Sequence, residues 1–524
     1  MIYDELMWQM RQAMPFEPTV GQAAAMDVFA RFYASGGDRA VMILRGAAGT
    51  GKTSVAGAAV RALRALRQKM VLMAPTGRAA KVFALNAGCP AFTIHRRIYR
   101  QKAFTGRLGG FQLNVNMQRD TLFIVDEASM IANTALPDAP FGSGCLLDDL
   151  VEYVYSAEGC RLMLIGDTAQ LPPVGEDVSP ALSASFMRGY SLSVHECGID
   201  EVLRQAYGSG ILSNATAIRQ LTAAGGRVQL PQVVFRGFAD IQVVMGSDLI
   251  EQLSDSYSHV GMDETIVITR SNKRAGIYNA GIRQMILGRE ETLSRGDMLM
   301  VVKNNYYWKP PRMTATEDAS DINGDDISHS EDNGGERITD GNARDDGMGK
   351  GIGGRQTAAR QELTSPAFVA NGDRARVVRV RHTREFYGLH FADVTLSFPD
   401  YDDMEMTVTA ILDALSTETP ALTRDQQEAL FQGVLADHGD LTRKGERMRA
   451  VKEDPLFNAL QVKYAYAVTC HKAQGGQWSH VYVDQGFMTD DMLTPSYIHW
   501  LYTAFTRATT KLFLVNWPKT QTKQ

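Results

Sequence analysis

A glycine-rich loop between two apolar segments places the strongest constraint on how this chain can fold. Residues 45–54 read RGAAGTGKTS and fit the pattern G-x-x-x-x-G-K-[ST]. Residues 41–44 form an apolar run typical of a buried parallel strand, and Val55, Ala59 and Leu63 recur after the loop at helical spacing. Glycines let backbone N–H groups surround phosphate oxygens, and a helix N-terminus adds partial positive charge. The order of strand, loop and helix therefore predicts a phosphate-binding loop rather than a chance match.

The side chains of this loop are those that a nucleoside triphosphate site requires. We expect Lys52 to reach the β- and γ-phosphates of ATP and the Thr53 hydroxyl to hold Mg²⁺. Upstream, Gln22 precedes a helix predicted over 23–33 with Thr19 as its N-cap; its amide can pair with the edge of adenine, or it can be an ordinary surface residue. The expected cofactors are ATP and Mg²⁺, and the expected nucleotide contacts are Gln22, Gly46, Gly49, Thr50, Gly51, Lys52, Thr53 and Ser54.

Two further apolar runs end in polar residues. Residues 122–125 are followed by Asp126 and Glu127, and residues 162–165 are followed by GDTAQLPPV, which contains Gln170. Strand ends are where α/β sheets bind their ligands. We therefore expect Asp126 to hold Mg²⁺, Glu127 to orient or deprotonate the attacking water, and Gln170 to sense the γ-phosphate.

A basic segment follows the run TIH at residues 93–95. No acid occurs from residue 93 to residue 118, and glycines at 106, 109 and 110 predict a small hairpin or protruding loop. Cations interleaved with aromatic rings suit single-stranded nucleic acid, through phosphate contacts and base stacking. A solvated basic loop is the alternative interpretation. The side chains concerned are Arg96, Arg97, Tyr99, Arg100, Lys102, Phe104, Arg107 and Phe111.

The bulk composition is that of an ordinary globular protein. The chain has 524 residues and a formal net charge of −5, so any basic surface must be local. Its 5 cysteines are scattered without a C-x-x-C pair, which suits a reducing compartment. The residues MIYDE at the N-terminus are not those of a signal peptide, and no apolar run approaches membrane-spanning length. We expect a cytoplasmic protein without a membrane partner.

The composition changes sharply in the second half of the chain. Residues 311–350 contain eleven acids, four bases and no aromatic residue, which predicts a disordered acidic insertion. The hairpin signal Asn371-Gly372 and apolar runs near 375–380 and 392–398 then predict a small β-barrel. Thr423 and Gln426 form a capping-box pattern that opens a helix.

Eight segments in this order resemble the motifs of superfamily 1 helicases, especially the RecD- and Dda-like branch. The segments are GAAGTGKT, APTGRAAK, TIH, VDEAS, GDTAQLPPV, EVLRQ, AVTCHKAQG and YTAFTRA. The resemblance covers almost the whole chain except the acidic insertion. The QLPPV continuation and the TCHKAQG block resemble the 5′→3′ branch rather than the UvrD-like branch.

The resemblance implies an α/β fold with two RecA-like domains and ATP in the cleft between them. Gln22 then corresponds to the adenine-reading glutamine, Gln170 to the γ-phosphate sensor, and Arg204 and Arg507 to two arginine fingers. Phe104, chosen over Tyr99 and Phe111 because it is nearer Gly106, corresponds to the tip of a duplex-splitting pin. The positions that correspond to strand contacts are Pro75, Thr76, Thr93, His95, Thr469 and His471.

The implied domain boundaries follow the composition. The first RecA-like domain covers 1–210, with the hairpin at about 96–116, and the second covers 211–308 and 461–524. The acidic insertion covers 309–365, and an SH3-like barrel with a helical insertion covers 366–460.

The leading functional hypothesis is an ATP-hydrolysing DNA helicase that translocates 5′→3′ on single-stranded DNA. We expect a monomer whose partners are single-stranded and forked DNA, in replication, repair or recombination. An RNA helicase and a protein-displacing translocase are alternatives with the same ATPase core. A subunit whose ATP site only controls assembly is a further alternative. The presence of Lys52, Asp126, Glu127 and Arg507 argues against it, because a pseudo-enzyme usually loses one of these groups.

Overall fold

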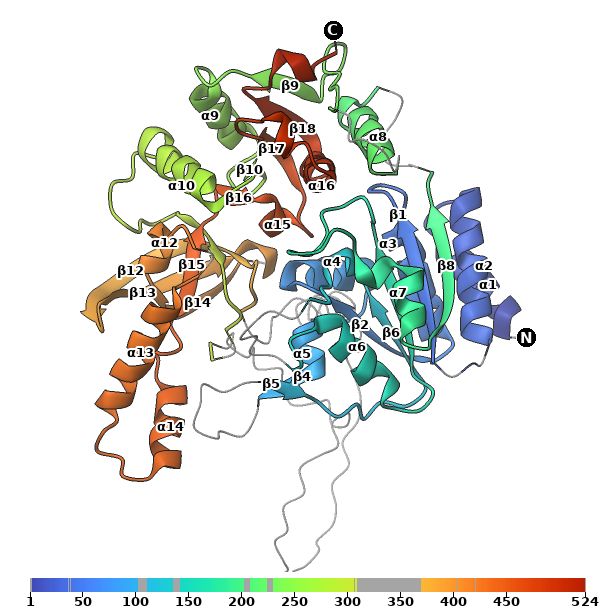
Figure 1. Cartoon of the computed structure of the whole chain (residues 1–524), viewed down its shortest axis with the longest axis horizontal. Helices are drawn as coiled ribbons and strands as arrows, with labels where there is room; N and C mark the ends of the chain where they lie inside the picture. Colours follow the sequence, from blue (N-terminus) through green and yellow to red (C-terminus); the bar gives the residue numbers. More distant parts are fainter. Residues whose placement is uncertain are drawn as a thin grey trace, which may run out of the picture.

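The structure is a computed structural model, and it contains two α/β units with a β-barrel beside the second unit (Figure 1). It describes residues 2–35, 37, 39–101, 111–134, 142–201, 208–223, 230–305, 307–308, 369–401, 403–419 and 421–523. Phe104, Arg204 and the predicted acidic insertion lie outside these described residues.

The first unit is a parallel sheet with helices on both faces, as the sequence predicts. Its strand order is β3-β2-β6-β7-β1-β8. Met42 and Leu44 of β1 pack with α2 and α3, whereas Val41 and Ile43 pack with α6 on the other face, so the central strand is apolar throughout. The strands are β1 Ala40–Gly46, β2 Lys69–Ala74, β3 Ala91–Thr93, β6 Thr121–Val125, β7 Arg161–Gly166 and β8 Ser193–Ile199; the helices are α1 Ile2–Ala13, α2 Val20–Ala34, α3 Lys52–Ala65, α4 Gly77–Ala87, α5 Ile94–Ile98, α6 Leu146–Tyr155 and α7 Ala184–Gly189, with short turns η1 Ala128–Met130 and η2 Pro180–Leu182.

The second unit is also a parallel sheet, of order β16-β10-β17-β18-β9. Two segments of the chain build it, one before and one after the barrel, and a single core cluster joins them. The strands are β9 Ile241–Val244, β10 Thr265–Thr269, β16 Ala467–Thr469, β17 Trp478–Asp484 and β18 Ala508–Val515; the helices are α8 Gly210–Ala223, α9 Leu249–His259, α10 Asn272–Gly281 with its π-helical continuation η3 Ile282–Ile286, α15 Cys470–Ala473 and α16 Pro495–Phe505, with η5 Asp490–Met492 and η6 Lys519–Gln521. The prediction of two RecA-like domains with parallel sheets is confirmed.

The predicted barrel is present and closed, in the order β11-β12-β13-β14-β15. Its first and last strands come from segments that the sequence assigned to the second RecA-like domain, so the barrel extends beyond 366–460 on both sides. Strand periodicity cannot reveal this, because β11 pairs with strands far away in the sequence. The strands are β11 Met298–Val301, β12 Arg374–Phe386, β13 Leu389–Phe398, β14 Met404–Ile411 and β15 Leu460–Tyr464; η4 Pro399–Tyr401 follows β13, and the helices α12 Asp413–Ser416, α13 Arg424–Asp437 and α14 Lys444–Glu453 lie between β14 and β15.

Local signals set the barrel's longest hairpin and its helical insertion. Tyr387 and Gly388 both have positive φ, 56° and 71°, which is the conformation of a tight two-residue hairpin turn. This turn joins β12 to β13, and both strands are longer than the sequence predicts. The capping box of Thr423 and Gln426 is formed at the start of α13.

The base of the predicted basic hairpin is formed by β4 Tyr99–Gln101 and β5 Phe111–Leu113. The Tyr99 ring is buried, and its hydroxyl donates to Asp149 at 2.5 Å. Phe111 packs against the same core of the first unit. Both aromatic rings therefore anchor the base of the hairpin to the domain.

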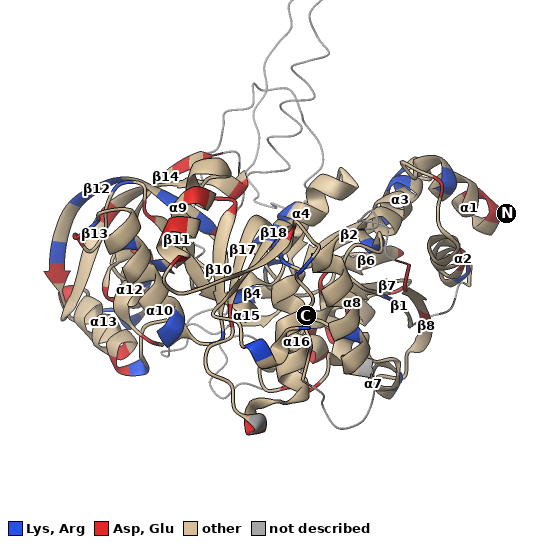
Figure 2. Ribbon diagram, turned by 90° about the horizontal axis from the view of Figure 1, so that it is seen from above, with Lys and Arg blue, Asp and Glu red and all other residues tan. Residues whose placement is uncertain are grey.

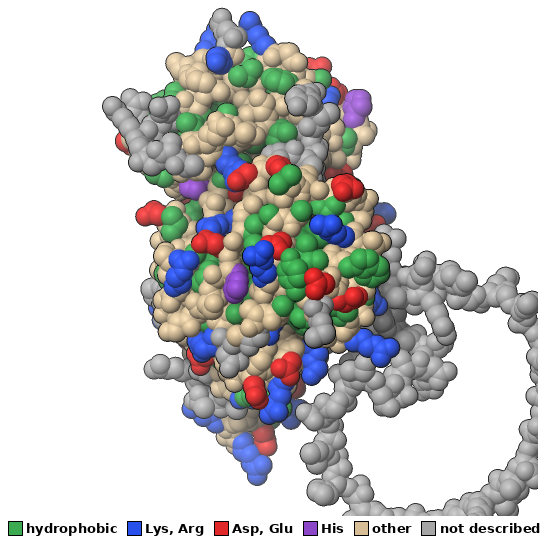
Figure 3. Space-filling view, turned by 90° about the vertical axis from the view of Figure 1, so that its right-hand side faces the viewer, with side chains coloured by type: hydrophobic (Ala, Val, Ile, Leu, Met, Phe, Trp, Pro, Cys, Tyr) green, Lys and Arg blue, Asp and Glu red, His purple; other side chains and the backbone are tan. Residues whose placement is uncertain are grey.

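Charged and apolar side chains are mixed over the described surface. Basic residues follow the outer part of β12 (Figure 2), where Arg379, Arg381, His382 and Arg384 are exposed. On the face that carries the N-terminal helices, hydrophobic side chains are interspersed with charged ones (Figure 3). A search of the described helices finds none with the length and apolar character that a membrane span requires.

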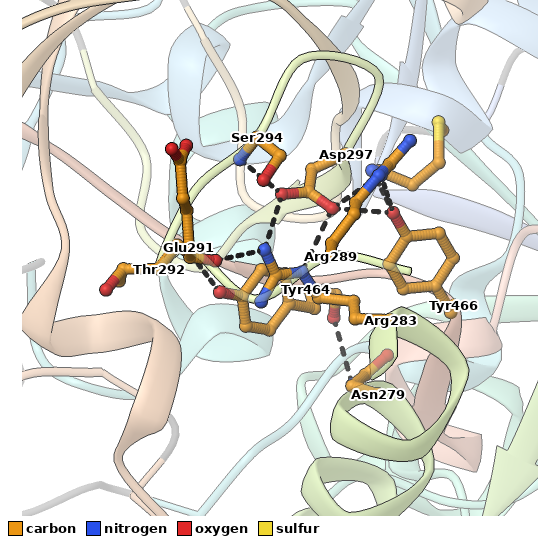
Figure 4. A network of polar contacts seen from close by, with 10 residues as sticks. Asn279, Arg283, Arg289, Glu291, Thr292, Ser294, Asp297, Tyr464 and Tyr466 are labelled. Carbon is orange, nitrogen blue, oxygen red and sulfur yellow. Dashed lines mark hydrogen bonds and ion pairs between the residues drawn. The ribbon is translucent and has the colours of Figure 1, made fainter. Parts of the chain in front are cut away.

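A buried carboxylate joins the barrel to the second α/β unit (Figure 4). Asp297, which is 0% exposed, precedes β11 and accepts from Arg283 Nε at 3.1 Å and from Arg289 Nη1 at 2.6 Å. The Tyr466 hydroxyl donates to the same carboxylate at 2.9 Å, and the Ser294 N–H donates at 2.7 Å. Because Arg283 belongs to η3 and Tyr466 follows the last barrel strand, this network fixes the barrel against the RecA-like sheet.

We predict that Asp297→Asn lowers the free energy of unfolding by about 3 kcal/mol, because it leaves the buried Arg283 and the partly buried Arg289 without their carboxylate. Urea denaturation followed by circular dichroism measures the change. Glu453→Gln is the matched control, since Glu453 pairs with Arg449 at 3.0 Å on the exposed side of α14 and should change the stability little. If the two variants are equally stable, the network does not hold the barrel in place.

Candidate functional site

The phosphate-binding loop is preformed between β1 and α3. Gly49 and Gly51 have φ of 82° and 84°, which glycine adopts without strain. A Cβ on Gly46 would lie 2.7 Å from the Ile199 carbonyl oxygen and 2.8 Å from the Thr50 hydroxyl, so no larger residue fits there. The buried Thr50 hydroxyl donates to the Ala47 carbonyl at 3.0 Å. Thr53 and Ser54 stand in the first turn of α3, at the mouth of the loop.

The Lys52 side chain folds back over the phosphate-binding loop. Its Nζ donates to the carbonyl oxygens of Gly46 and Ala47, both at 2.8 Å. An ammonium group has three donors, so two are engaged by the loop itself. The side chain is therefore held at the position where a phosphate would enter.

The two predicted acids follow β6, separated from the loop by β7. Burial and the neighbouring Glu127 raise the pKa of Asp126 to about 7, while Lys52 opposes this shift. The Glu127 N–H donates to Asp126 Oδ1 at 2.8 Å. Glu127 itself has a φ of 52°, a conformation that is costly for a residue with a side chain and that gathers at functional sites. The structure thus brings Lys52, Asp126 and Glu127 into one charged group.

These residues fit a magnesium nucleotide. A carboxyl group whose pKa is raised by burial and by a second carboxylate has surplus negative charge when ionised, which a divalent cation would offset. Thr53 and Asp126 supply oxygen ligands of the type that Mg²⁺ prefers. The glycine loop supplies N–H groups for phosphate oxygens.

Gln170 and Asp167 follow β7 and face the second α/β unit. Gln170 is 5% exposed, and its Oε1 has no hydrogen-bond partner among the described residues. Asp167 Oδ2 accepts from the Tyr502 hydroxyl at 2.7 Å, and the same hydroxyl accepts from the Ala48 N–H of the loop at 3.2 Å. Tyr502 belongs to α16 of the second unit, so it closes the cleft over the phosphate loop.

Three further bonds join the two units beside Tyr502. The Leu171 N–H donates to the Thr503 hydroxyl at 2.7 Å, and Gln474 Nε2 donates to the Leu171 carbonyl at 2.7 Å. His499 Nδ1 lies 2.9 Å from the Ala169 carbonyl. The second unit therefore binds the residues on both sides of Gln170, so a movement of that unit is transmitted to Gln170.

Arg507 follows α16 and is 3% exposed. Its guanidinium donates to the carbonyl oxygens of Thr503, at 3.1 Å, and Gly476, at 3.2 Å. It is thus held by neutral acceptors of its own unit. The second predicted arginine, Arg204, lies outside the described residues.

Gln22 has a structural role that the sequence did not predict. Its Oε1 accepts from the Thr19 N–H at 3.2 Å and completes the capping box of α2. Its Nε2 donates to the Thr50 carbonyl at 3.1 Å, and the side chain is buried. The amide therefore connects the start of α2 with the phosphate loop, and the interpretation as an ordinary surface residue is wrong.

The predicted strand contacts of the first unit lie at the ends of β2 and β3. Thr76, which follows Pro75, accepts from the Ala79 N–H and caps α4, and Thr93 accepts from the Arg96 N–H and caps α5. Each hydroxyl retains its own hydrogen to donate. Burial lowers the pKa of His95 to about 4, so its imidazole is neutral at physiological pH and would contact a strand without charge.

The predicted contacts of the second unit lie around α15. Gly475, with a φ of 74°, lies beside Thr76, and a Cβ on Gly475 would be in ordinary contact with the Thr76 hydroxyl at 3.5 Å. The two groups of predicted strand contacts therefore meet at the domain boundary. His471 is exposed on this surface, and Thr469 lines a cavity of about 420 Å³ between the second unit and the barrel.

Three lysines and one glutamate are among the residues that line this cavity, namely Lys273, Lys463, Lys472 and Glu418. Burial, together with the charge of Lys463, lowers the pKa of Lys472 to about 8, and burial also lowers the pKa of Lys463. Lys463 donates to the Thr417 hydroxyl at 3.1 Å, which ties it to α12 of the barrel. Lys472 and Lys463 were not singled out from the sequence; the only signal for Lys472 was its place in the TCHKAQG block.

Two regions of the chain match known protein families. The AAA domain family matches residues 19–226, and the UvrD-like helicase C-terminal domain family matches residues 464–515. The ATP-dependent RecD2 DNA helicase of Deinococcus radiodurans is 32% identical over 135 residues, which are 26% of this chain and 16% of that protein. The match thus spans a small part of that relative.

Solved structures of similar outline include two Pif1 helicases. The Pif1 helicase from Bacteroides in complex with ADP-AlF3 and ssDNA is 14% identical, with 97% of this chain and 95% of that chain covered and a TM-score of 0.45. The Pif1 helicase from Candida albicans is also 14% identical, with 97% and 96% covered and a TM-score of 0.40.

The matched regions contain both halves of the candidate site. Residues 19–226 include the phosphate loop, the two acids and Gln170, and residues 464–515 include Thr469, His471 and Arg507. These family matches and the RecD2 match confirm that the chain resembles the superfamily 1 helicases of the RecD-like branch.

Proposed function

We propose that this protein is an ATP-dependent DNA helicase that translocates 5′→3′ on single-stranded DNA. The observation that carries the proposal is the cleft itself. Lys52, Asp126 and Glu127 lie on one side, and α16 of the second unit closes over the phosphate loop through Tyr502. An ATPase with its nucleotide between two domains can convert hydrolysis into movement of one domain against the other.

Each residue then has a defined task. ATP bound with Mg²⁺ would supply the phosphoanhydride bond whose cleavage drives the cycle. Lys52 would hold the transferred phosphoryl group, Thr53 and Asp126 would hold the metal, and Glu127 would orient or deprotonate water. Gln170 would report the state of the γ-phosphate to the second unit through the hydrogen bonds of the residues on both sides of it. Arg507, with Arg204, would offset charge that develops in the transition state.

The strand would cross both units at the ends of their strands. Pro75, Thr76, Thr93 and His95 form the part on the first unit, and Thr469 and His471 form the part on the second. The basic hairpin with Phe104 would separate the duplex by base stacking at its tip, as a rigid obstacle to the second strand. The cationic cavity beside Thr469 would extend this path to the barrel.

A forked-duplex assay tests the proposal directly. The wild-type protein should unwind a duplex with a 5′ single-stranded tail and leave one with a 3′ tail intact. Glu127→Gln should abolish unwinding while the protein still binds ATP, because water activation is lost and the metal ligand Asp126 is kept. Unwinding of an RNA fork alone would favour an RNA helicase, and ATPase activity without unwinding would favour a protein-displacing translocase. Full turnover by Glu127→Gln would contradict the role of that residue.

The raised pKa of Asp126 predicts a pH dependence. The pKa of the native carboxyl is about 7, whereas the ordinary pKa of 3.8 applies after unfolding. The native state therefore binds more protons within this window, and stability falls as the pH rises through it. Without nucleotide, we expect Asp126→Asn to gain stability relative to wild type between about pH 4 and about pH 7, and wild-type affinity for Mg²⁺-ATP to rise over the same range. Parallel stability curves for the two proteins would contradict the shift.

The cavity beside Thr469 predicts a contribution of Lys472 to strand binding. Lys472→Gln should weaken binding of oligothymidine and reduce the slope of log K against log salt by about 0.7, because one phosphate contact is lost. Lys511→Gln, which removes the same charge from the exposed part of β18, is the matched control and should leave the slope unchanged. Fluorescence anisotropy at several salt concentrations measures both. Equal slopes for wild type and Lys472→Gln would place the strand elsewhere.

A further inference from the structure

Trp478 is the point at which the three parts of the molecule meet. It begins β17 of the second unit, and its side chain is 1% exposed. The guanidinium carbon of Arg78, from α4 of the first unit, lies 4.5 Å from the ring centroid. That of Arg374, the first residue of β12 in the barrel, lies 5.6 Å from it. A guanidinium within about 6 Å of an aromatic ring is attracted by the ring electrons, so one indole binds both other parts.

The turn that carries Trp478 also holds Arg507. Arg507 Nη1 donates to the Gly476 carbonyl at 3.2 Å, and the Trp478 N–H donates to the Arg507 carbonyl at 2.9 Å. From the opposite unit, Arg78 Nη2 donates to the Gln477 carbonyl at 3.2 Å. Residues 476–478 are therefore held by Arg507 within one unit and by Arg78 from the other.

The side chains around the turn at residues 476–478 are closely packed. A Cβ on Gly476 would lie 2.5 Å from the Trp478 ring and 3.1 Å from Arg78 Nη1. Any movement of Arg78 relative to the second unit must consequently displace the ring or the turn. Since protein interiors transmit such displacements rather than absorb them, the turn is a stiff connection between α4 and Arg507.

Asp400 offsets part of the positive charge of this cluster. Arg374 Nη2 donates to Asp400 Oδ1 at 3.1 Å. Burial alone would raise the pKa of Asp400, but the positive charges of Arg78 and Arg374 hold this pKa below its ordinary value. Burial lowers the pKa of Arg78 to about 10, so its guanidinium stays charged at neutral pH. Arg78 thus contacts a carbonyl and a ring, with the charge of Asp400 nearby, which favours a mechanical role over direct capture of a phosphate.

We propose that Arg78 and Trp478 are positioning residues for Arg507, and that they transmit strand binding on the first unit to the far side of the nucleotide cleft. This rests on the proposed function, in which Thr76 contacts the strand. Arg78 is two residues further along, in the first turn of α4. A strand that draws α4 toward the second unit presses Arg78 against the turn and seats Arg507. Separation of the two units withdraws Arg78 and releases the turn.

Kinetics of Arg78 variants test this connection. Arg78→Ala should lower the kcat of strand-stimulated ATP hydrolysis about tenfold, with the KM for ATP and the Kd for oligothymidine changed by less than about twofold. Arg78→Lys, which keeps a cation over the ring, should restore part of the rate. Arg64→Ala is the matched control, because Arg64 likewise donates to a backbone carbonyl, that of Gly88, within the first unit. An unchanged kcat in Arg78→Ala, or weaker strand binding with an unchanged kcat, would overturn the proposal.

Tryptophan emission supplies a readout that a purely structural role would not move. A non-hydrolysable ATP analogue added with oligothymidine should change the emission of the wild-type protein. That change should be absent in Trp478→Phe and in Arg78→Ala, and it should persist in Arg64→Ala. The same change in wild type and Trp478→Phe would show that the ring does not sense closure, and would overturn the proposal. If the wild-type protein hydrolyses no ATP, the proposed function fails, while the emission experiment still decides whether Arg78 and Trp478 report closure.

Discussion

The hydroxyl group of Tyr502 is the interaction on which the arrangement of the cleft depends. It accepts from the phosphate loop at Ala48 and donates to Asp167 at the end of the neighbouring strand. Both partners belong to the first unit, whereas Tyr502 belongs to the second. Ala48 and Asp167 lie at the carboxyl edge of the first sheet, where α/β sheets bind ligands, whereas Tyr502 lies in the last turn of α16, near the start of β18. The tyrosine therefore joins the ligand-binding edge of the first sheet to the opposite edge of the second. Burial raises the pKa of Tyr502 further above its ordinary range, so the hydroxyl keeps the proton that it donates.

The barrel depends on the second unit in a comparable way. Asp297 binds two arginines and a tyrosine where the chain enters the barrel, and Arg374 reaches back to Trp478 and to the Asp263 carbonyl. These contacts use charged groups that are buried and almost fully bonded. Groups of this kind are costly to separate, so the barrel moves together with the second unit rather than as a tethered module. Movement in the molecule is then concentrated at the cleft and at the contacts of the first unit.

The sequence predicted the parts of the fold that local patterns determine. The strand before the phosphate loop, the N-cap at Thr19, the capping box at Thr423 and the presence of a small barrel all follow from short-range signals. It did not predict that β11 and β15 complete the barrel, because their pairing joins segments far apart in the chain. The same limit applies to the site. Lys52, Asp126 and Glu127 were identified from motifs and do lie together, whereas Tyr502 and Trp478 act through contacts between units that no sequence spacing encodes.

Several residues that are predicted to bind a ligand already make hydrogen bonds within the protein, and their two roles have a common physical basis. Lys52 donates to carbonyl oxygens of its own loop, and Gln22, Thr76 and Thr93 complete helix caps. A ligand therefore replaces or joins existing hydrogen bonds, and such an exchange contributes little net free energy when both acceptors are neutral. Exchange for a charged phosphate oxygen is different, because charge-assisted bonds are about twice as strong. The site also needs a cation, because the buried Asp126 beside Glu127 carries negative charge that Lys52 offsets only in part. A metal-bound triphosphate supplies both charges, an anion that pairs with Lys52 and a cation that pairs with Asp126. The metal alone or the nucleotide alone supplies only one of them.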